Sequence, residues 1–251
     1  MKNILFTLII SISFVTFAFG QDVTGILKEG DRLELVPDQK AAFLKFKEAL
    51  KIQPTNLHAL TKCAELCSSI GNREATTKSR DDYFAVALIY AKTAYKLYPE
   101  SDVANVAMAI AQGRIILLKS GKEKIVAVKD LKMFAEKAVS VNPNNFKAWH
   151  ILGKWHYEVS NLTSFERGAA KIFYGALPTA SLANAIAYYE KAKTLSPNFI
   201  LNYLELAKAY KRNGEKVKAI KQLNFLLTLK NIVEDDAKVK IEAGDLLKKL
   251  K

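Results

Sequence analysis

The sequence is poor in the residues that interrupt regular structure. Its 251 residues include only 11 glycines and 6 prolines, and no Ser-rich or Gly-rich linker divides the chain. Separate domains are usually joined by such segments, so their scarcity favours one continuous array over two globular units. Half of the residues are apolar, which is enough to form a substantial core. We therefore treat residues 21–251 as one domain.

Residues that carry catalysis or metal binding are also scarce, with two cysteines and three histidines in the whole chain. Because no G-x-S-x-G, P-loop, H-E-x-x-H or C-x2-C motif is present, we predict no enzyme activity, no catalytic residue, no cofactor and no metal site. Cys63 and Cys67 lie four apart on one helical face, with only His58 nearby as a further ligand. We expect both to be small core residues, because a helix holds such a pair poorly for a disulfide.

Only one long apolar run occurs, from Ile4 to Phe19. Ala18 and Gly20 supply the small residues of a cleavage site that follows such a run. We therefore predict an export signal over residues 1–20 that is cleaved after Gly20, and a periplasmic protein that is at most peripheral to a membrane. An uncleaved N-terminal anchor is the alternative, because about 17 apolar residues is the short end of the spanning range.

Acidic residues are outnumbered, with 25 Asp and Glu against 38 Lys and Arg and a formal net charge of +13. An excess of this size favours anionic partners such as acidic peptides or lipid head groups. The alternative is that most lysines only solvate the outer faces of helices. An exported protein meets little nucleic acid, so we predict no nucleic-acid partner.

Four prolines follow the same local pattern. An alanine lies five residues before each proline and an apolar residue lies two before it. The alanines are Ala49, Ala94, Ala138 and Ala192, the apolar residues are Ile52, Leu97, Val141 and Leu195, and the prolines are Pro54, Pro99, Pro143 and Pro197. Proline disfavours helical geometry in the residue before it, so this pattern predicts a repeated helix end.

The clearest repeat begins at Phe146 and matches the tetratricopeptide pattern. Trp149, Leu152 and Gly153 have its W-x2-L-G spacing, and Ala185, Tyr189 and Pro197 take its later positions. The glycine allows the second helix of the pair to pack closely on the first. Gly30 takes the same place in a first repeat that runs from Val23 to Pro54.

The remaining repeats follow the same phase with two irregularities. The second begins with a helix over Leu57–Ile70, after which the polar stretch 73–82 either extends the next helix backward or forms an exposed loop. The third covers Asp102–Pro143. The fourth is about twenty residues too long for a 34-residue repeat, and we expect the excess to be an inserted helix with a capping box at Thr163 and Glu166.

The inserted helix carries an apolar stripe, which consists of Phe165, Ala169, Ile172, Phe173 and Ala176. We expect the stripe to pack on the fourth repeat, as aromatic residues at helical spacing usually do. The alternative is a movable flap over a lipid-sized cavity. The residues of that possible cavity are Phe165, Arg167, Phe173, Leu201 and Leu204.

Together these patterns predict an all-α solenoid of about five tetratricopeptide-like helix pairs, with the inserted helix in the fourth repeat. A last helix from about Asp235 has one apolar side, and such a helix is needed to cover the core of the final repeat. We expect the protein to be a monomer.

In such a solenoid the first helix of each pair lines a concave groove. The phase of the repeats places a mostly cationic set of residues there, namely Lys147, His150, Lys154, Tyr157, Lys208, Lys211, Arg212 and Arg114. The earlier repeats contribute Asp31, Glu34, His58, Thr61 and Glu65 instead. We hypothesise a binding module that holds an acidic or extended peptide of a partner protein through charge-assisted hydrogen bonds. An anionic phospholipid near the inserted helix is the alternative ligand.

From Trp149 onward the order of features resembles the regulator of microtubule dynamics family. The shared features are the LGKWHYEV run, the Phe-Glu-Arg inserted helix with paired alanines, the Leu-Pro-Thr break and a helix followed by Ser-Pro-Asn-Phe. Animal members are helical repeat proteins linked partly to microtubules and partly to contacts between endoplasmic reticulum and mitochondria, where the repeat domain is credited with phospholipid binding. The resemblance implies the fold and a preference for acidic or lipid-like ligands. Because an exported protein would not meet microtubules, no cellular role is transferred.

Overall fold

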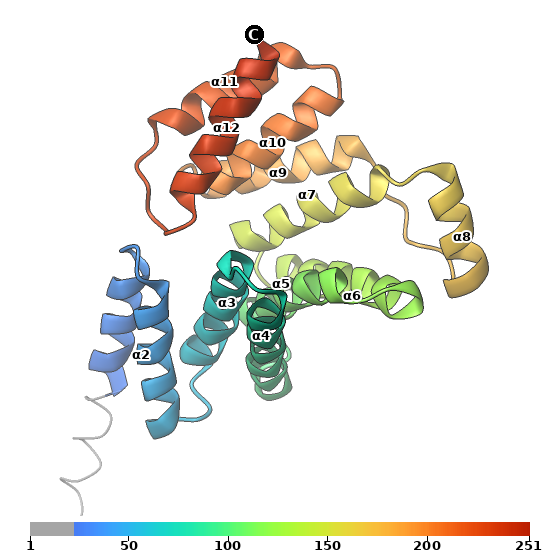
Figure 1. Ribbon diagram of the computed structural model, residues 1–251. Helices are drawn as coiled ribbons and strands as arrows, with labels where there is room; N and C mark the ends of the chain where they lie inside the picture. The colour runs from blue at the N-terminus through green and yellow to red at the C-terminus, as the bar shows by residue number, and fades with distance from the viewer. Residues whose placement is uncertain (1–22) are drawn as a thin grey trace, which may run out of the picture.

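The computed structural model describes residues 23–251, where all regular secondary structure is α-helical. A helix over residues 23–34 is followed by eleven more, which are labelled in Figure 1. They are α2 (Gln39–Ile52), α3 (Leu57–Arg73), α4 (Thr77–Leu97), α5 (Asp102–Leu118), α6 (Gly121–Val141), α7 (Phe146–Ser160), α8 (Ser164–Tyr174), α9 (Leu182–Leu195), α10 (Ile200–Arg212), α11 (Lys216–Thr228) and α12 (Asp236–Leu250). The predicted export signal lies outside the described residues. Within these residues, no helix combines the length and apolar character that crossing a bilayer requires.

The helices pack in consecutive pairs, α3 with α4, α5 with α6, α7 with α9 and α10 with α11. The helix over residues 23–34 packs on α2 through Ile26 and Phe46. The first helices of neighbouring pairs also touch: α3 packs on α5, α5 on α7, and α7 on α10. These helices therefore form the inner wall of a curved array (Figure 1). α12 covers α10 and α11 at the C-terminal end. The predicted solenoid with an inserted helix and a capping helix is confirmed.

Four of these helices end three residues after one of the recurring alanines. The backbone N–H of the residue before each proline donates to the carbonyl of the alanine, and the alanine side chain is fully buried. The four bonds run from Gln53 to Ala49 (2.8 Å), Tyr98 to Ala94 (2.8 Å), Asn142 to Ala138 (2.9 Å) and Ser196 to Ala192 (2.9 Å). Each of these helix ends therefore combines a buried alanine with a last backbone hydrogen bond just before the proline.

The glycine of the repeat pattern permits the closest contact between paired helices. A Cβ atom on Gly153 would lie 2.7 Å from the ring of Tyr189, and one on Gly30 would lie 2.8 Å from the ring of Phe46. In the second pair Gly71 takes this role instead, against Phe84 at 2.8 Å. The predicted role of Gly30 and Gly153 is confirmed.

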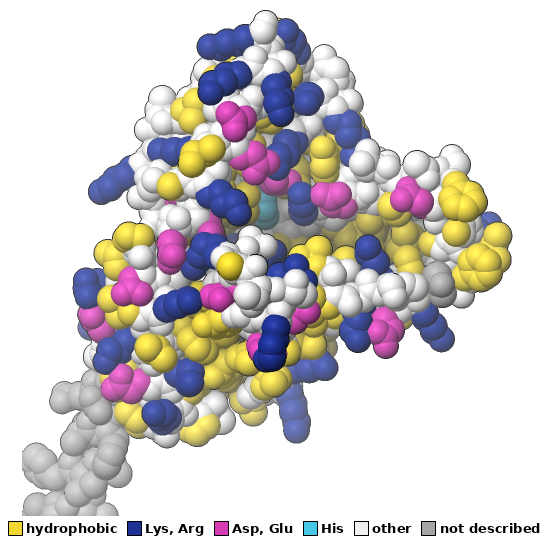
Figure 2. Space-filling model, in the orientation of Figure 1, with side chains coloured by type: hydrophobic (Ala, Val, Ile, Leu, Met, Phe, Trp, Pro, Cys, Tyr) yellow, Lys and Arg dark blue, Asp and Glu magenta, His cyan; other side chains and the backbone are white. Residues whose placement is uncertain are grey.

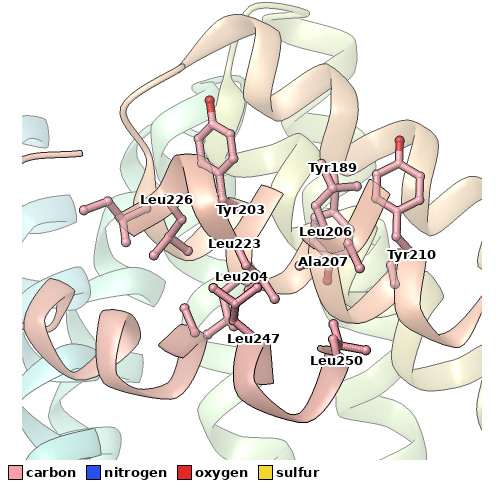
Figure 3. Close-up of a cluster of buried hydrophobic side chains, with 14 of the residues drawn as sticks. Tyr189, Tyr203, Leu204, Leu206, Ala207, Tyr210, Leu223, Leu226, Leu247 and Leu250 are labelled. Atoms are coloured by element: carbon pink, nitrogen blue, oxygen red, sulfur yellow. The ribbon is translucent and has the colours of Figure 1, made fainter. Parts of the chain in front are cut away.

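Buried side chains continue from pair to pair. Figure 3 shows the C-terminal part of this core, where Leu204 of α10 lies beside Leu247 of α12. Cys63 and Cys67 are buried free thiols, as predicted, and burial raises the pKa of Cys67 to about 12. His156 is also a core residue, and its Nδ1 accepts a hydrogen bond from the backbone N–H of Ser181 at 3.3 Å.

The polar stretch 73–82 extends the second helix of its pair backward, which was one of the two expectations. α3 ends at Arg73 and α4 begins at Thr77, so only three residues separate the two helices. The side chain of Thr76 accepts a hydrogen bond from the N–H of Ser79 and caps α4.

The inserted helix α8 forms with its predicted capping box. Thr163 Oγ1 accepts from the N–H of Glu166 at 3.2 Å, and the Glu166 carboxylate accepts from the N–H of Thr163 at 2.7 Å. The expectation that its stripe packs on the fourth repeat is wrong, because Phe165 is 85% exposed, Ile172 77% and Phe173 70%. α8 packs on α6, and among the described side chains of α8 only Ala170 is buried. The large apolar side chains therefore face outward on a helix that projects from the body (Figure 1).

Candidate functional site

The eight predicted ligand residues all lie on first helices of the pairs, on α5, α7 and α10. They lie in three places: a central part of the wall whose lysines are bound to acidic residues, a groove at the C-terminal end of the array that shares Lys208 with the central part, and Arg114 by itself. Figure 2 shows that the molecule is hollowed between its N-terminal and C-terminal helices, and that cationic and acidic side chains alternate around this hollow.

In the N-terminal half of the inner wall, acidic and basic side chains are paired. His58 contacts Asp31 at 2.8 Å and Lys62 donates to Glu34 at 2.5 Å. Lys147 of α7 reaches Glu65 of α3 at 2.5 Å. Burial opposes ionisation of Glu65, but the attraction of Lys147 and Lys62 outweighs it and holds the pKa of this carboxyl below its ordinary value.

A second network is centred on Glu205 of α10, whose side chain is 7% exposed. Its two oxygens accept from Lys154 at 2.7 Å and from Lys208 at 2.9 Å. Lys154 also bridges Glu158 at 2.9 Å, and Lys208 also bridges Glu242 at 2.7 Å. Lys147, Lys154 and Lys208 together face four glutamates, so this central part of the wall has no excess of positive charge.

His150 is held between neighbouring aromatic rings. Its ring centroid lies 4.9 Å from that of Phe199 and 5.5 Å from that of Tyr189, and its Nδ1 is 2.9 Å from Oδ1 of Asn202. Burial lowers the pKa of His150 more than Asn202 and Glu205 raise it. The imidazole is therefore neutral at pH 7 and acts as a packing and hydrogen-bonding group.

The residues of the possible lipid cavity are not brought together. Leu204 is 1% exposed because α12 packs across it, so it is not part of the groove wall. Phe165 and Phe173 are on α8, which packs on α6. Among the described helices, α8 has no such packing contact with α10. Arg167 donates from its guanidinium to the carbonyl of Val159 at the end of α7.

The second group of predicted residues lines an open groove between the C-terminal ends of α7 and α10 and the helix α12. We call it the C-terminal groove, and its volume is about 740 Å³. It is lined by Tyr157, Lys208, Lys211, Arg212, Lys238, Ile241, Glu242, Asp245, Leu246 and Lys249. Four of the eight predicted ligand residues are in this list.

Most of the cations of the C-terminal groove have no acidic partner. Lys211, Lys238 and Lys249 are exposed, and within residues 23–251 none of these side chains forms a hydrogen bond or an ion pair. Arg212 donates to the carbonyl of Tyr157 and to Ser160 Oγ, both at 2.7 Å, and its guanidinium lies 4.9 Å over the Tyr157 ring. These contacts fix the orientation of Arg212 without neutralising it.

Sequence reasoning missed the residues that α12 contributes to this groove. It assigned α12 to cover the core and counted only the charges on first helices of pairs. Lys238 and Lys249 lie on the side of α12 away from Leu247, and the alternation of apolar and charged residues along the helix could have indicated them. Glu205 also had a signal, because it lies three residues before Lys208 on the same helix.

Arg114 lies alone in the third group. Its guanidinium is 5.6 Å over the ring of Phe84, and its Nε is buried without a hydrogen-bond partner. Burial lowers the pKa of Arg114 and the attraction of Asp235 opposes this effect. Since Asp235 precedes α12, Arg114 faces the point where the two ends of the array meet.

The ends of the array are joined there by a small polar cluster, which we call the clasp. It consists of Gln39, Arg73, Glu234 and Asp235. Arg73 donates to Glu234 at 3.2 Å, to Asp235 at 2.9 Å and to the side chain of Gln39 at 3.0 Å. The backbone N–H of Gln39 also donates to Glu234 at 3.1 Å. The loop before α12 thereby contacts the first and second repeats. Figure 1 shows this loop close to the ends of α2 and α3.

Reversing the charge of the clasp is expected to separate the two ends. Arg73→Glu places three carboxylates together, so the free energy of unfolding should fall by about 1–2 kcal/mol and the array should open. Small-angle X-ray scattering would then give a larger radius of gyration. Arg80→Glu is the control, because among the described residues Arg80 forms an ion pair only with its neighbour Asp81. Equal radii for the two variants would show that the clasp does not hold the array closed.

Comparison with known proteins agrees with this architecture. Residues 26–251 match the family described as regulator of microtubule dynamics protein 1-3. Regulator of microtubule dynamics protein 1 of Caenorhabditis elegans is 31% identical over 160 residues, which cover 64% of this chain and 71% of that protein. The Bos taurus protein of the same name is 30% identical over 163 residues, which cover 64% of this chain and 51% of that protein. The chain thus spans only about half of the bovine protein.

A solved structure shows the same fold. A thermophilic tetratricopeptide repeat protein of Thermus thermophilus superposes with a TM-score of 0.66 at 18% sequence identity, over 90% of this chain and 98% of that one. Proteins with this repeat fold are typically non-enzymatic scaffolds that bind other proteins. The family match extends over nearly all of the described helices, including α8 and α12. The chain therefore belongs to the regulator of microtubule dynamics protein 1-3 family.

Proposed function

We propose that the protein is a non-enzymatic scaffold that holds an acidic, extended segment of a partner protein in the C-terminal groove. The observation that carries this proposal is the set of three unpaired lysines, Lys211, Lys238 and Lys249, around one groove. Cations that already contact a carboxylate gain little from a second one, whereas unpaired cations can form new charge-assisted hydrogen bonds. The free cations are therefore the ones that an acidic ligand would use.

The walls of the groove suit a segment with both acidic and apolar residues. Tyr157, Ile241 and Leu246 supply apolar surface between the lysines, and Ile241 is 69% exposed. Glu242 and Asp245 lie on the same side of α12 and would repel acidic residues from part of the groove. The expected ligand therefore places carboxylates near the lysines and an apolar side chain near Ile241.

Reversing the three lysine charges tests the proposal. The probe is a fluorescein-labelled peptide of alternating glutamate and leucine, and fluorescence anisotropy measures its dissociation constant. The combined Lys211→Glu, Lys238→Glu and Lys249→Glu variant should bind this peptide at least about tenfold more weakly, which corresponds to a loss of about 1.4 kcal/mol. Binding by the unchanged protein should also weaken as salt rises, since exposed charges are screened.

The control carries the same change in net charge at three other exposed lysines, Lys28, Lys92 and Lys221, which form no ion pair within residues 23–251. Their reversal to glutamate should leave the dissociation constant within about twofold, because screening removes most of the effect of distant charges. If both variants lose affinity equally, or if a peptide with lysine in place of glutamate binds as well, the C-terminal groove is not the acidic-peptide site.

An anionic phospholipid is the second candidate ligand, but fewer observations support it. Leu204 is covered by α12 and the possible cavity residues are divided between α8 and α10, so a lipid-sized enclosure near α8 has no support from their positions. Mass spectrometry of lipids that co-purify with the protein would decide between the two ligands.

A further inference from the structure

The most unusual surface of the molecule is the outer face of α8. Phe165, Ile172 and Phe173 are each at least 70% exposed, and all three lie on one side of an 11-residue helix. Single exposed apolar residues are normal on protein surfaces, whereas a cluster of large ones marks a site of interaction. On the face shown in Figure 2, this apolar cluster forms the tip of the projecting arm.

Basic residues lie on the polar side of α8 and near its C-terminal end. On α8, Arg167 and Lys171 are cationic, and the only acidic residue, Glu166, is bonded to Thr163 within the capping box. Just beyond the helix, Lys129 of α6 lies beside Gly175, whose Cβ position is 3.5 Å from the lysine Nζ. Within residues 23–251 neither Lys129 nor Lys171 forms an ion pair. The arm thus combines an apolar tip with unneutralised cations beside it.

We infer that α8 is a membrane-binding arm, whose apolar face enters the interfacial region of an anionic lipid bilayer. An amphipathic helix with aromatic and aliphatic residues on one face and cations beside it binds such a surface by burying the apolar face and by attraction to anionic head groups. Lys171 is long enough to reach head groups while its stem lies along the apolar boundary. This inference is independent of the peptide proposed for the C-terminal groove.

The shape of the arm favours a bilayer over a protein partner. A bilayer accepts any apolar side chain that reaches it, so a small convex tip is sufficient. A stable protein interface instead needs on the order of 1,000 Å² of complementary surface, which a tip of three side chains does not provide alone. The backbone beside α8 also fits a projecting element, since Gly175 ends the helix with φ of 82°, a value that favours glycine.

Vesicle binding by the full chain tests this inference. Sedimentation with vesicles of phosphatidylcholine and phosphatidylglycerol measures the bound fraction, and vesicles of phosphatidylcholine alone test the role of charge. The combined Phe165→Ser and Ile172→Ser variant should partition at least about tenfold more weakly into the anionic vesicles. Both side chains are exposed, so the helical circular dichroism should remain unchanged.

The matched control removes two exposed apolar residues elsewhere, Ile89→Ser and Val217→Ser, which are 63% and 81% exposed. This variant should bind the anionic vesicles like the unchanged protein, because its arm is intact. Equal binding by the two variants would overturn the inference. Equal binding of the unchanged protein to both kinds of vesicle would also overturn it, because the attraction to anionic head groups would be absent.

A local readout separates insertion from mere adsorption of the protein. Phe165→Trp should show a blue-shifted emission with anionic vesicles and quenching by brominated lipids, whereas Val217→Trp should show neither. If light scattering instead shows that the serine variant at 165 and 172 loses a dimer while vesicle binding is unchanged, the face belongs to a second copy of the chain and the inference fails.

Discussion

Replacing Gly153 with valine is expected to lower the free energy of unfolding by about 3 kcal/mol, because the new side chain overfills a tightly packed contact. A Cβ at this position would lie 2.7 Å from Cδ1 of Tyr189, well inside the normal separation of non-bonded carbons. The Tyr189 ring is fully buried between α7 and the helices that follow, so it cannot withdraw without disturbing them. Urea unfolding followed by circular dichroism should show a lower midpoint.

Gly244→Val in α12 is the matched control for this prediction. No atom outside the nearby backbone of α12 and the adjacent residues lies within 4 Å of the Cβ position of Gly244, and the change in helix propensity from glycine to valine is worth only about 0.5 kcal/mol. Similar midpoints for the two variants would contradict the close contact of α7 with α9. The contact also supports the inner wall, since the carbonyl of Tyr189 accepts from Asn202 at 2.8 Å and Asn202 in turn contacts His150.

The parts of the fold that sequence reasoning predicted are those that local rules determine. A residue before proline cannot easily stay helical, so the ends of α2, α4, α6 and α9 were visible in the alanine-to-proline interval. The capping box of α8 is equally local, because its two residues are three apart. The contact of Gly153 with Tyr189 joins two different helices, but it could be predicted because the repeat pattern specifies both positions.

The direction in which α8 faces could not be predicted in the same way. Apolar residues at helical spacing define a stripe, but the stripe is the same whether it packs on the protein or points away from it. α8 packs on α6 with Ala170 buried, and this placement depends on where the chain after Ser160 turns. The buried residue of α8 is the small Ala170, whereas its large apolar residues are exposed.

Charge pairing across the array was also hidden from the sequence. The basic groove was predicted by counting the cations on first helices, and its lysines lie on α7 and α10. Lys154 and Glu205 are 51 residues apart and meet only because α7 and α10 are neighbours. The clasp joins Gln39 to Glu234, 195 residues away, through a loop that no repeat pattern describes. The repeat period in the sequence predicts where a residue lies along the solenoid. Contacts between the two ends depend on how strongly the solenoid curves, which the period does not specify.

Replacing Glu205 with glutamine is expected to destabilise the protein by about 3 kcal/mol at pH 7, at the lower end of the range for breaking a buried ion pair. The carboxylate is nearly buried and accepts from both Lys154 and Lys208, which would be left facing a neutral amide. The loss stays at the lower end because Glu158 and Glu242 still contact the two lysines. Urea midpoints of the two proteins at pH 7 measure the difference.

The pH dependence of this difference identifies its cause. Burial raises the pKa of Glu205, but the attraction and hydrogen bonds of Lys154 and Lys208 outweigh burial, so the folded pKa lies below the ordinary value of 4.5. Its contribution to stability is therefore fully present above pH 4.5 and is lost as pH falls through the folded pKa. The two proteins should converge in stability at acidic pH, and a gap that stays constant would assign the loss to packing. Glu158→Gln is the control, because this carboxylate is 55% exposed and its removal should cost less than about 1 kcal/mol at any pH.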